Sequence, residues 1–272
     1  MDWKLATPKG VTINLPPVLA YHLIDRRPDA GIAWTTPARF EKQIAWLADA
    51  GYRSLSLSDY LLHPPTANQK RVVITFDDGY RSLLQYALPI LARYHFIATV
   101  FVIAGYVGRV NAWDVKFFLP RFAHLDWHEL RELTAAGWEI GSHSLNHDYL
   151  PALADAELRR DLVDSRKILT DHLQTPIRHL SLPFGRGSER VYQTARDAGY
   201  ESVSILGSGN PSSSPISLIS RRGVYLLDSM RSFRRRVEAP PDSSWQYWRQ
   251  RAISSLALGT VVVKSVKKML AG

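Results

Sequence analysis

Short apolar runs alternate with longer helical patterns along most of this chain, and this alternation is the strongest constraint on its fold. Each helical pattern is long enough to cross over between two parallel strands. The expected strands cover residues 18–21, 53–57, 72–76, 98–103, 139–142, 180–182 and 202–206, and the expected helices cover 37–50, 82–94, 127–136, 155–173 and 189–198. This series predicts a closed or nearly closed α/β barrel, with its active site at the carboxyl ends of the strands.

The length of 272 residues suits a single barrel domain, and 46% hydrophobic and 22% charged residues are typical of a globular protein. We expect residues 1–237 to form the barrel and 238–272 to form a linker and a basic amphipathic helix. From Trp245 onward, apolar residues recur mostly at three- or four-residue spacing. The uncharged stretch Ala252–Val263 is too short to cross a bilayer.

The chain contains no cysteine, which excludes disulfides, thiolate metal sites and cysteine nucleophiles. Histidine, aspartate and glutamate remain as strong metal ligands. The segment Met1–Ala6 lacks the charged start and apolar stretch of a secretory signal. We therefore expect a cytoplasmic protein or one that faces the cytoplasm.

The net charge of +9 would attract nucleic acid, an anionic membrane surface or an anionic substrate, and charge alone does not choose among them. Much of the excess lies late in the chain, which favours a surface function for the C-terminal part. The residues are Arg231, Arg234, Arg235, Arg236, Arg249, Arg251, Lys264, Lys267 and Lys268. The final helix would then contact a membrane surface or, alternatively, pack on the barrel.

Two adjacent carboxylates, Asp77 and Asp78, follow the apolar run 72–76 directly. Their mutual repulsion at a strand end must be relieved by a cation or a proton. One carboxylate can ligate a metal while its neighbour points the other way and remains available as a base. The competing interpretation is an Asp-Asp-Gly turn without chemistry.

Two histidines, His143 and His147, stand four residues apart at the end of the expected strand 139–142. This spacing lets both rings face one ion if the segment turns helically. Two imidazoles and one carboxylate leave coordination positions open for water and substrate, which is typical of a catalytic metal site. A pair of surface histidines is the alternative.

Together the segments TFDDG at 75–79 and HSLNH at 143–147 resemble the two signatures, TFDDG and HxxxH, of the polysaccharide deacetylases. These proteins carry the NodB-homology domain and form carbohydrate esterase family 4. The likeness runs from about Pro17 to Tyr225 and covers most of the chain. It implies a distorted (β/α)7 barrel of the NodB-homology type.

The resemblance also implies a role for each residue of the two segments. Asp77 would be the general base, and the metal ligands would be Asp78, His143 and His147. Zinc is the expected ion, and cobalt or nickel would suit the same ligands. Such an ion polarises the acyl carbonyl and lowers the pKa of a water, from which Asp77 would take a proton.

The chain departs from the family pattern near Pro183 and Phe184. In the family a Pro-Tyr segment lines the site and supplies an oxyanion-hole amide; here Phe184 keeps the amide and lacks the hydroxyl. The arginine that usually precedes this segment and orients the base is missing. By the resemblance, Arg221 or Arg222 could replace it.

The proton for the leaving amine usually comes from a C-terminal histidine, but no histidine follows His179. A subgroup that resembles bacterial exopolysaccharide (poly-N-acetylglucosamine) deacetylases carries it in an N-terminal Tyr-His segment, which Tyr21-His22 matches. His22 is thus the candidate general acid, against the alternative of a strand-end histidine without a role. For the others we expect ordinary surface or core roles: His63, His95, His124, His128, His172 and His179.

By this resemblance the chain would hydrolyse an N-acetyl group from an amino sugar in a polysaccharide, an oligosaccharide or a lipid-linked glycan. The expected partner is an N-acetylated glycan, with no nucleic acid, and Trp113 beside Asp114 could stack on a sugar or lie in the core. The basic tail would suit a peripheral enzyme at the inner membrane surface. The alternatives are an inactive carbohydrate-binding barrel and a hydrolase of non-sugar amides.

Overall fold

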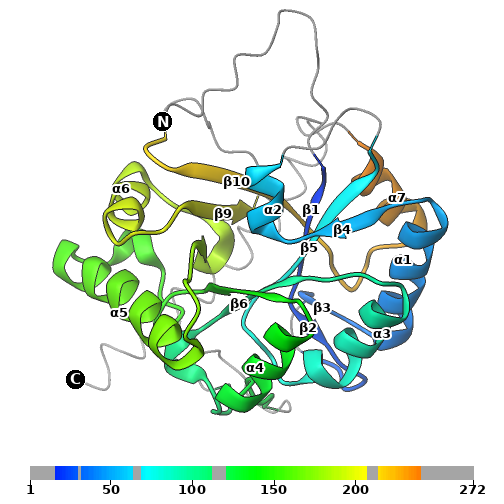
Figure 1. Cartoon of the computed structure of the whole chain (residues 1–272), viewed down its shortest axis with the longest axis horizontal. Coiled ribbons are helices and arrows are strands. Elements are labelled where there is room, and N and C mark those ends of the chain that lie inside the picture. Colours follow the sequence, from blue (N-terminus) through cyan, green and yellow to red (C-terminus); the bar gives the residue numbers. More distant parts are fainter. Residues whose placement is uncertain (1–15, 30–31, 64–68, 112–120, 207–213, 240–272) are drawn as a thin grey trace, which may run out of the picture.

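A parallel sheet that closes on itself forms the centre of the molecule (Figure 1), as seen in a computed structural model that describes residues 16–29, 32–63, 69–111, 121–206 and 214–239. Strand β1 pairs with both β5 and β10, which closes the ring. Of the eight strands in this sheet, β4 (Arg53–Leu55) pairs beside the start of β5 and the other seven form the ring. These are β1 (Val18–Tyr21), β5 (Arg71–Phe76), β6 (Thr99–Val102), β7 (Glu139–Ser142), β8 (His179–Ser181), β9 (Ser202–Leu206) and β10 (Ser217–Gly223). The predicted (β/α)7 barrel is confirmed.

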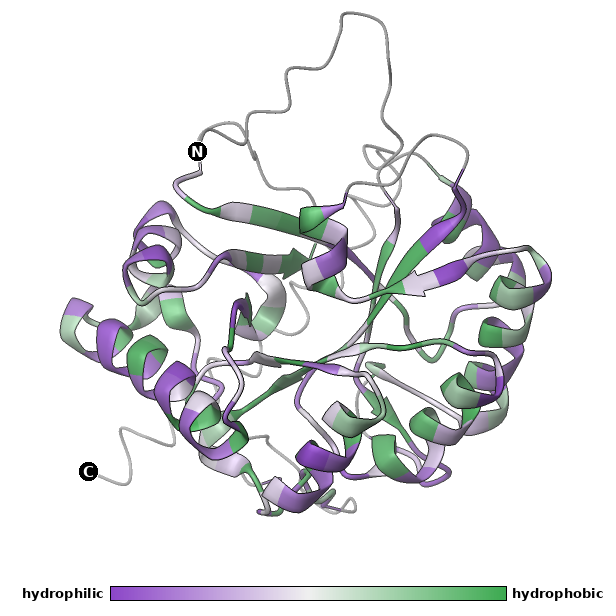
Figure 2. Cartoon of the chain, viewed as in Figure 1, coloured by the Kyte–Doolittle hydropathy of each residue, from purple (hydrophilic) through white to green (hydrophobic). Residues whose placement is uncertain are grey.

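Helices cover the outside of the ring, with their apolar sides towards the strands. Figure 2 shows helices that alternate between hydrophilic and hydrophobic residues, while the inner strands are largely hydrophobic. The helices around the ring are α1 (Pro37–Asp49), α3 (Leu88–Arg93), α4 (Trp127–Ala135), α5 (Asp155–Leu173), α6 (Glu189–Asp197) and α7 (Met230–Glu238). The short elements are β2 (Leu23–Ile24), β3 (Trp34–Thr35), α2 (Leu57–Leu62), η1 (Leu83–Ala87), η2 (Ala104–Tyr106), η3 (Leu150–Ala152) and η4 (Pro183–Gly185).

Local sequence signals explain where several helices begin. The Thr36 hydroxyl caps α1, whose first residue is Pro37, a residue that fits the first turn because its missing N–H has no partner there. Helix α4 begins with a capping box in which Asp126 and Glu129 each accept a hydrogen bond from the other's backbone N–H. These signals made the helix starts predictable to within a few residues.

The strand that completes the ring was not predicted. Strand β10 reads SLISRRG and lacks the continuous apolar run that marks a strand buried on both faces. Helices α2 and α7 were also missed. The prediction that the late arginines serve the surface is wrong for Arg236, which is buried and pairs with Asp228 through two hydrogen bonds of 2.6 and 2.7 Å.

The interior of the ring is packed rather than hollow, as is usual for such barrels. Val18, Val73, Phe101 and Ile219 come from four strands and form one apolar cluster, and Leu57 of α2 joins it. Gly141 leaves room for this cluster, because a Cβ atom there would lie 2.6 Å from the ring of Phe101. Apolar side chains therefore fill the middle of the lumen.

A buried polar network closes the end of the barrel where the strands begin. Glu139 Oε2 accepts hydrogen bonds from the backbone N–H of Leu57 at 2.8 Å and from the Thr99 hydroxyl at 3.0 Å. The ring of His179 lies 2.9 Å from the hydroxyls of both Ser58 and Ser202. This network fixes the first turn of α2 beneath the lumen, and His179 has the core role that we expected.

The C-terminal part of the described chain packs on the barrel. Phe233 of α7 is fully buried and meets Trp46 edge to face at 5.9 Å. The expected helix within 238–272 lies almost entirely outside the described residues, so its membrane contact and the location at the inner membrane surface stay predictions. Within the described ranges, no helix combines the length and the apolar character needed to cross a membrane.

The Glu139 carboxylate should make the fold sensitive to acid. Burial alone would raise the pKa of Glu139, but hydrogen bonds and the charge of His179 outweigh it and lower this pKa from 4.5 to about 2. Because the folded pKa is depressed, the stabilisation is present above pH 4.5 and is lost as the pH falls towards 2. We expect Glu139→Gln to lower the free energy of unfolding at pH 7 by about 3 kcal/mol and by progressively less below pH 5.

Urea denaturation of the wild type and the variant between pH 7 and pH 3 measures this difference. Glu201→Gln is the matched control, since Glu201 forms an exposed pair with Arg178 and should contribute under about 1 kcal/mol at every pH. A Glu139→Gln deficit that stays constant from pH 7 to pH 3 would contradict the assignment.

Candidate active site

Asp77 and Asp78 follow β5 and point in different directions because the chain turns sharply between them. Asp78 has φ 69° and Gly79 has φ 66°, so two consecutive residues adopt the left-handed conformation. Aspartate tolerates this conformation better than most residues, and glycine does so without steric cost. The turn separates the two carboxylates into two environments, as expected from the sequence.

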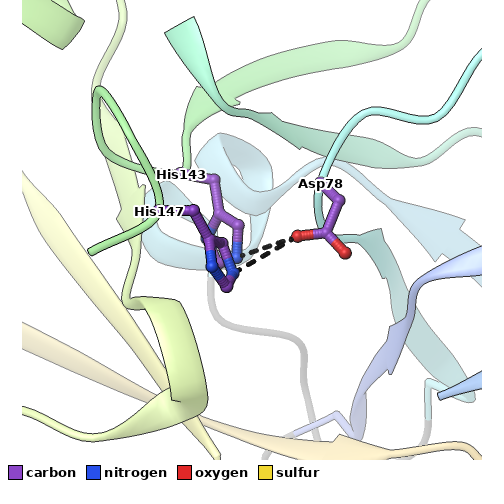
Figure 3. Close-up of side chains that lie close together, drawn as sticks. All are labelled: Asp78, His143 and His147. Carbon is purple, nitrogen blue, oxygen red and sulfur yellow. Dashed lines mark ion pairs between the residues drawn. The ribbon is translucent and has the colours of Figure 1, made fainter. Parts of the chain in front are cut away.

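Asp78, His143 and His147 form a buried cluster with the donor set of a metal site. Figure 3 shows that the two histidine rings lie together and face the Asp78 carboxylate. Asp78 Oδ1 is 3.5 Å from Nε2 of His143 and 3.5 Å from Nε2 of His147. Donor atoms of the three residues all lie within 4.8 Å of one another. Two ligands of a tetrahedral zinc ion, each bound at about 2.0–2.1 Å, are about 3.4 Å apart. The two distances from Asp78 are close to this value, so the three residues form a possible site for a divalent ion and would leave further coordination positions open.

His143 is held in the orientation that metal binding needs. Its Nδ1 lies 2.8 Å from the carbonyl oxygen of Ser181, which can only accept, so Nδ1 carries the proton and Nε2 faces Asp78. Burial lowers the pKa of His143 to about 4, so the ring is neutral at pH 7. A neutral imidazole that donates its other N–H to a carbonyl is the usual form of a metal-ligating histidine.

The second histidine reaches the cluster by a different route from the one that we predicted. Residues 143–147 do not form a helical turn; Ser144 and His147 have φ values of 67° and 56°. The backbone N–H of His147 donates to the Ser144 hydroxyl at 3.0 Å, which folds the segment back towards Asp78. The spacing of four residues was thus informative, although its helical explanation was wrong.

Asp77 lies in the lumen, where Arg221 of β10 clamps it. Arg221 donates to Asp77 Oδ1 at 2.7 Å and to Oδ2 at 2.8 Å, and it also donates to the Ser181 hydroxyl at 2.7 Å. Burial alone would raise the pKa of Asp77, but the charge and hydrogen bonds of Arg221, together with the nearby His143 and His22, outweigh it and hold this pKa well below the usual range. Asp77 is therefore an ionised carboxylate in a fixed orientation.

Of the two arginines that could replace the missing one, the structure selects Arg221. Its guanidinium is fully buried and lies 5.2 Å from the ring of Phe101. Arg222 points the other way and donates to the carbonyl oxygens of Arg236 and Val237 at the end of α7. Arg222 therefore stabilises a helix end and does not contact Asp77.

His22 lies beside Asp77 because of strand register. Tyr21 of β1 pairs with Phe76 of β5, which places the next residue of each strand side by side. His22 Nε2 is 3.7 Å from Asp77 Oδ2, and the His22 side chain is 18% exposed. Burial lowers the pKa of His22 from its ordinary value. The structure thus brings the predicted base and the predicted acid together.

Pro183 and Phe184 line the same site. They follow β8, and the ring of Phe184 lies 5.0 Å from the ring of His147 and 6.1 Å from that of Tyr149. Phe184 has φ 62°, so this segment also contains a left-handed residue. The predicted substrate-side residues Trp113 and Asp114 lie outside the described residues.

Three polar residues that support the site were not predicted. The Ser181 hydroxyl donates to Asp77 at 3.1 Å, and the Thr75 hydroxyl accepts from Arg221 at 3.1 Å. His124 Nδ1 lies 2.8 Å from the carbonyl oxygen of Asp78. Side chains alternate between the two faces of a strand, so Thr75 lies on the same face as Asp77, and Ser181 on the same face as Pro183. This alternation could have indicated the two hydroxyls. No signal in the sequence pointed to His124.

Several known proteins are similar to this chain in sequence. Residues 65–203 match the family model for polysaccharide deacetylases. YxkH of Bacillus subtilis, a polysaccharide deacetylase homologue, is 31% identical over 191 residues, which cover 68% of this chain and 62% of that protein. The poly-β-1,6-N-acetyl-D-glucosamine N-deacetylase of Staphylococcus aureus is 27% identical over 60% of this chain and 57% of that one. The chain therefore spans about three fifths of the length of these relatives.

Solved structures share the fold. The Streptococcus pyogenes deacetylase PplD, solved with acetate, superposes with a TM-score of 0.70 over 82% of this chain and 98% of that one, at 24% identity. IcaB from Ammonifex degensii superposes with a TM-score of 0.65 over 80% of this chain and 93% of that one, at 25% identity. The barrel thus has the architecture of known deacetylases.

The clamp on Asp77 should appear as energetic coupling between two side chains. Removing one partner of a buried ion pair leaves the other charge uncompensated, so we expect Arg221→Met to lower the free energy of unfolding by about 3–5 kcal/mol. Asp77→Asn should also be destabilising, and the double variant should lose clearly less than the sum of the two single losses. Urea denaturation in the presence of a chelator measures all three.

Arg178→Met, which breaks the exposed pair with Glu201, is the control and should cost under about 1 kcal/mol. Strictly additive losses in the Arg221 and Asp77 variants would show that the two side chains are not coupled.

Proposed function

The chain belongs to the polysaccharide deacetylase family, and from this premise we propose that it hydrolyses an N-acetyl group from an amino sugar of a glycan. The observation that carries the proposal is the pairing of two centres. The buried donors of Asp78, His143 and His147 fit a divalent ion. Asp77, the residue before Asp78, is an ionised carboxylate that points in a different direction. This is the arrangement that metal-assisted hydrolysis of an amide requires.

We assign a divalent ion, with zinc as the first candidate, to Asp78, His143 and His147. When bound, such an ion polarises the acyl carbonyl and lowers the pKa of a water to near neutrality. Two neutral imidazoles and one carboxylate leave a net positive charge on such a centre. That charge favours the negative charge that develops on the acyl oxygen.

Asp77 takes a proton from the attacking water. Its depressed pKa keeps it ionised throughout the neutral range, but the same depression makes it a weak base. It therefore suits a water whose own pKa has been lowered. Arg221 and Ser181 bind both carboxylate oxygens and hold them in place, so the base does not have to be oriented during the reaction.

His22 returns that proton to the leaving amine. Because burial lowers its pKa, the ring is neutral at pH 7 before the reaction and can accept a proton. The proton passes from water to Asp77 and then to His22 Nε2, 3.7 Å away, and reaches the amine nitrogen as the C–N bond breaks. The ring of Phe184 lies beside His147, and the backbone N–H of Phe184 donates a hydrogen bond to the tetrahedral oxyanion.

The substrate that we propose to test first is a polymer of N-acetylglucosamine, since the Staphylococcus aureus relative is named for its poly-β-1,6-linked form. A hydrolase of non-sugar amides remained open in the sequence because the family arginine was missing. Arg221 binds both carboxylate oxygens of Asp77, as the family arginine would, so the missing arginine no longer favours a non-sugar amide as substrate. An inactive carbohydrate-binding barrel would not need the buried metal donors.

Acetate release from N-acetylglucosamine oligomers tests the function directly. The purified protein should release acetate, lose this activity on chelation and regain it with zinc. Asp77→Asn should lower kcat by about 10²- to 10⁴-fold while zinc content, measured by elemental analysis, stays unchanged. Asp171→Asn on the exposed face of α5 is the control and should match the wild type. Full activity of Asp77→Asn, or failure of the wild type to bind supplied zinc, would refute the mechanism.

The role of His22 can be isolated by changing the leaving group. His22→Ala should lower glycan deacetylation by about 10²-fold or more, because an amine cannot leave without a proton. The same variant should hydrolyse 4-nitrophenyl acetate within about 10-fold of the wild-type rate, since nitrophenolate leaves unprotonated. Asp77→Asn, which acts on the water, should lower both rates. Equal losses on both substrates in His22→Ala would contradict the assignment of His22 as acid.

A further inference from the structure

A buried histidine outside the ligand set lies against the backbone of the metal site. His124 precedes α4 and is 2% exposed. Its Nδ1 lies 2.8 Å from the carbonyl oxygen of Asp78. A carbonyl oxygen only accepts, so Nδ1 must carry the proton and donate it. The bond therefore requires a particular tautomer of His124 and does not require a charged ring.

The residue that receives this bond is the one whose conformation matters most. Asp78 adopts φ 69°, a conformation that costs a non-glycine residue of order 1–3 kcal/mol and persists only when its surroundings impose it. If Asp78 relaxed to an ordinary extended conformation, its carboxylate would leave His143 and His147. Whatever holds the Asp78 peptide thus preserves the geometry of the three donors.

The segment that carries His124 is hydrogen-bonded to the residues that follow this peptide. The backbone N–H of Leu125 donates to Gly79 at 2.9 Å, and the N–H of Arg81 donates to Ala123 at 2.8 Å. These two bonds fix the residues that follow Asp78. The His124 side chain adds a third hydrogen bond, which reaches the carbonyl oxygen of Asp78 itself.

The ring of His124 is itself held in position. It stacks on Tyr80 at 5.1 Å with an interplanar angle of 16°, and the ring of Tyr106 lies 5.8 Å away. The backbone N–H of His124 donates to Arg109 at 2.8 Å. The Tyr80 hydroxyl accepts a hydrogen bond from Asn111 at 3.1 Å. A donor fixed in this way is preorganised, and its bond loses little side-chain entropy.

We propose that His124 is a positioning residue of the metal site, which holds Asp78 in its left-handed conformation by donating from Nδ1 to the Asp78 carbonyl and thereby raises the affinity for the divalent ion. The proposal rests on the metal assignment made above. It concerns the orientation of a ligand through its backbone, and it gives His124 no contact with substrate or with the reacting atoms.

Substitutions at His124 can separate donation from ring packing. His124→Phe keeps a flat ring against Tyr80 and removes the donor. His124→Asn keeps an N–H donor near the place of Nδ1, whereas the longer side chain of His124→Gln places its amide near Nε2. We expect the zinc dissociation constant to rise by about 10- to 100-fold in the Phe and Gln variants and to stay within about 3-fold of the wild-type value in the Asn variant.

Competition between the metal-free protein and a chromophoric chelator measures zinc affinity, and circular dichroism checks that each apoprotein is folded. His172→Phe is the control, because His172 stacks on Trp127 at 4.0 Å on an exposed part of α5. It should bind zinc as the wild type does. If the Phe variant does not fold, the comparison of Asn with Gln still decides.

Two results would overturn the proposal: unchanged zinc affinity in both the Phe and the Gln variants, or an equal loss in the Asn and Gln variants. Failure of the metal assignment itself would look different, because the wild-type protein would then bind no zinc.

Discussion

The buried ion pair between Asp77 and Arg221 is the interaction on which the site depends. Both side chains are almost completely buried, and two charges removed from water are tolerated only when geometry and hydrogen bonding are favourable. Here both carboxylate oxygens accept from the guanidinium, and the hydroxyls of Ser181 and Thr75 complete the network. The contacts join three strands across the lumen, so the pair also requires that the barrel be closed.

The side chains that fill the rest of the lumen support the Asp77–Arg221 pair. Arg221 rests on the ring of Phe101, and Phe101 has room because residue 141 is a glycine. Beneath this layer, the Glu139 and His179 network holds α2 against the beginning of the strands. The candidate active site thus lies at one end of the barrel and a structural polar network at the other, with apolar packing between them. This agrees with the general division in α/β barrels.

Two adjacent aspartates have different proposed functions because their surroundings differ. Asp77 faces a fixed cation and is held ionised, whereas an oxygen of Asp78 lies 3.5 Å from two histidine rings. The left-handed turn at Asp78 and Gly79 produces this separation, and the segment at 123–125 supports the turn from outside the barrel. Environment, rather than residue type, thus underlies the proposal that one carboxylate is the base and the other a metal ligand.

The sequence by itself determined the parts that depend on local pattern. Alternating strand and helix patterns predicted a barrel, and two short motifs identified candidate site residues, Asp77, Asp78, His143 and His147. Periodicity and spacing can be recognised in the sequence without knowledge of long-range contacts. Only the tertiary structure decided between Arg221 and Arg222, since adjacent residues of a strand face opposite sides and the register of β10 against β9 sets which one enters the lumen. The same holds for Ser181 and His124, whose partners lie 104 and 46 residues away in the chain. Their roles arise from the closure of the ring and the packing of a loop against it, and neither leaves a local pattern in the sequence.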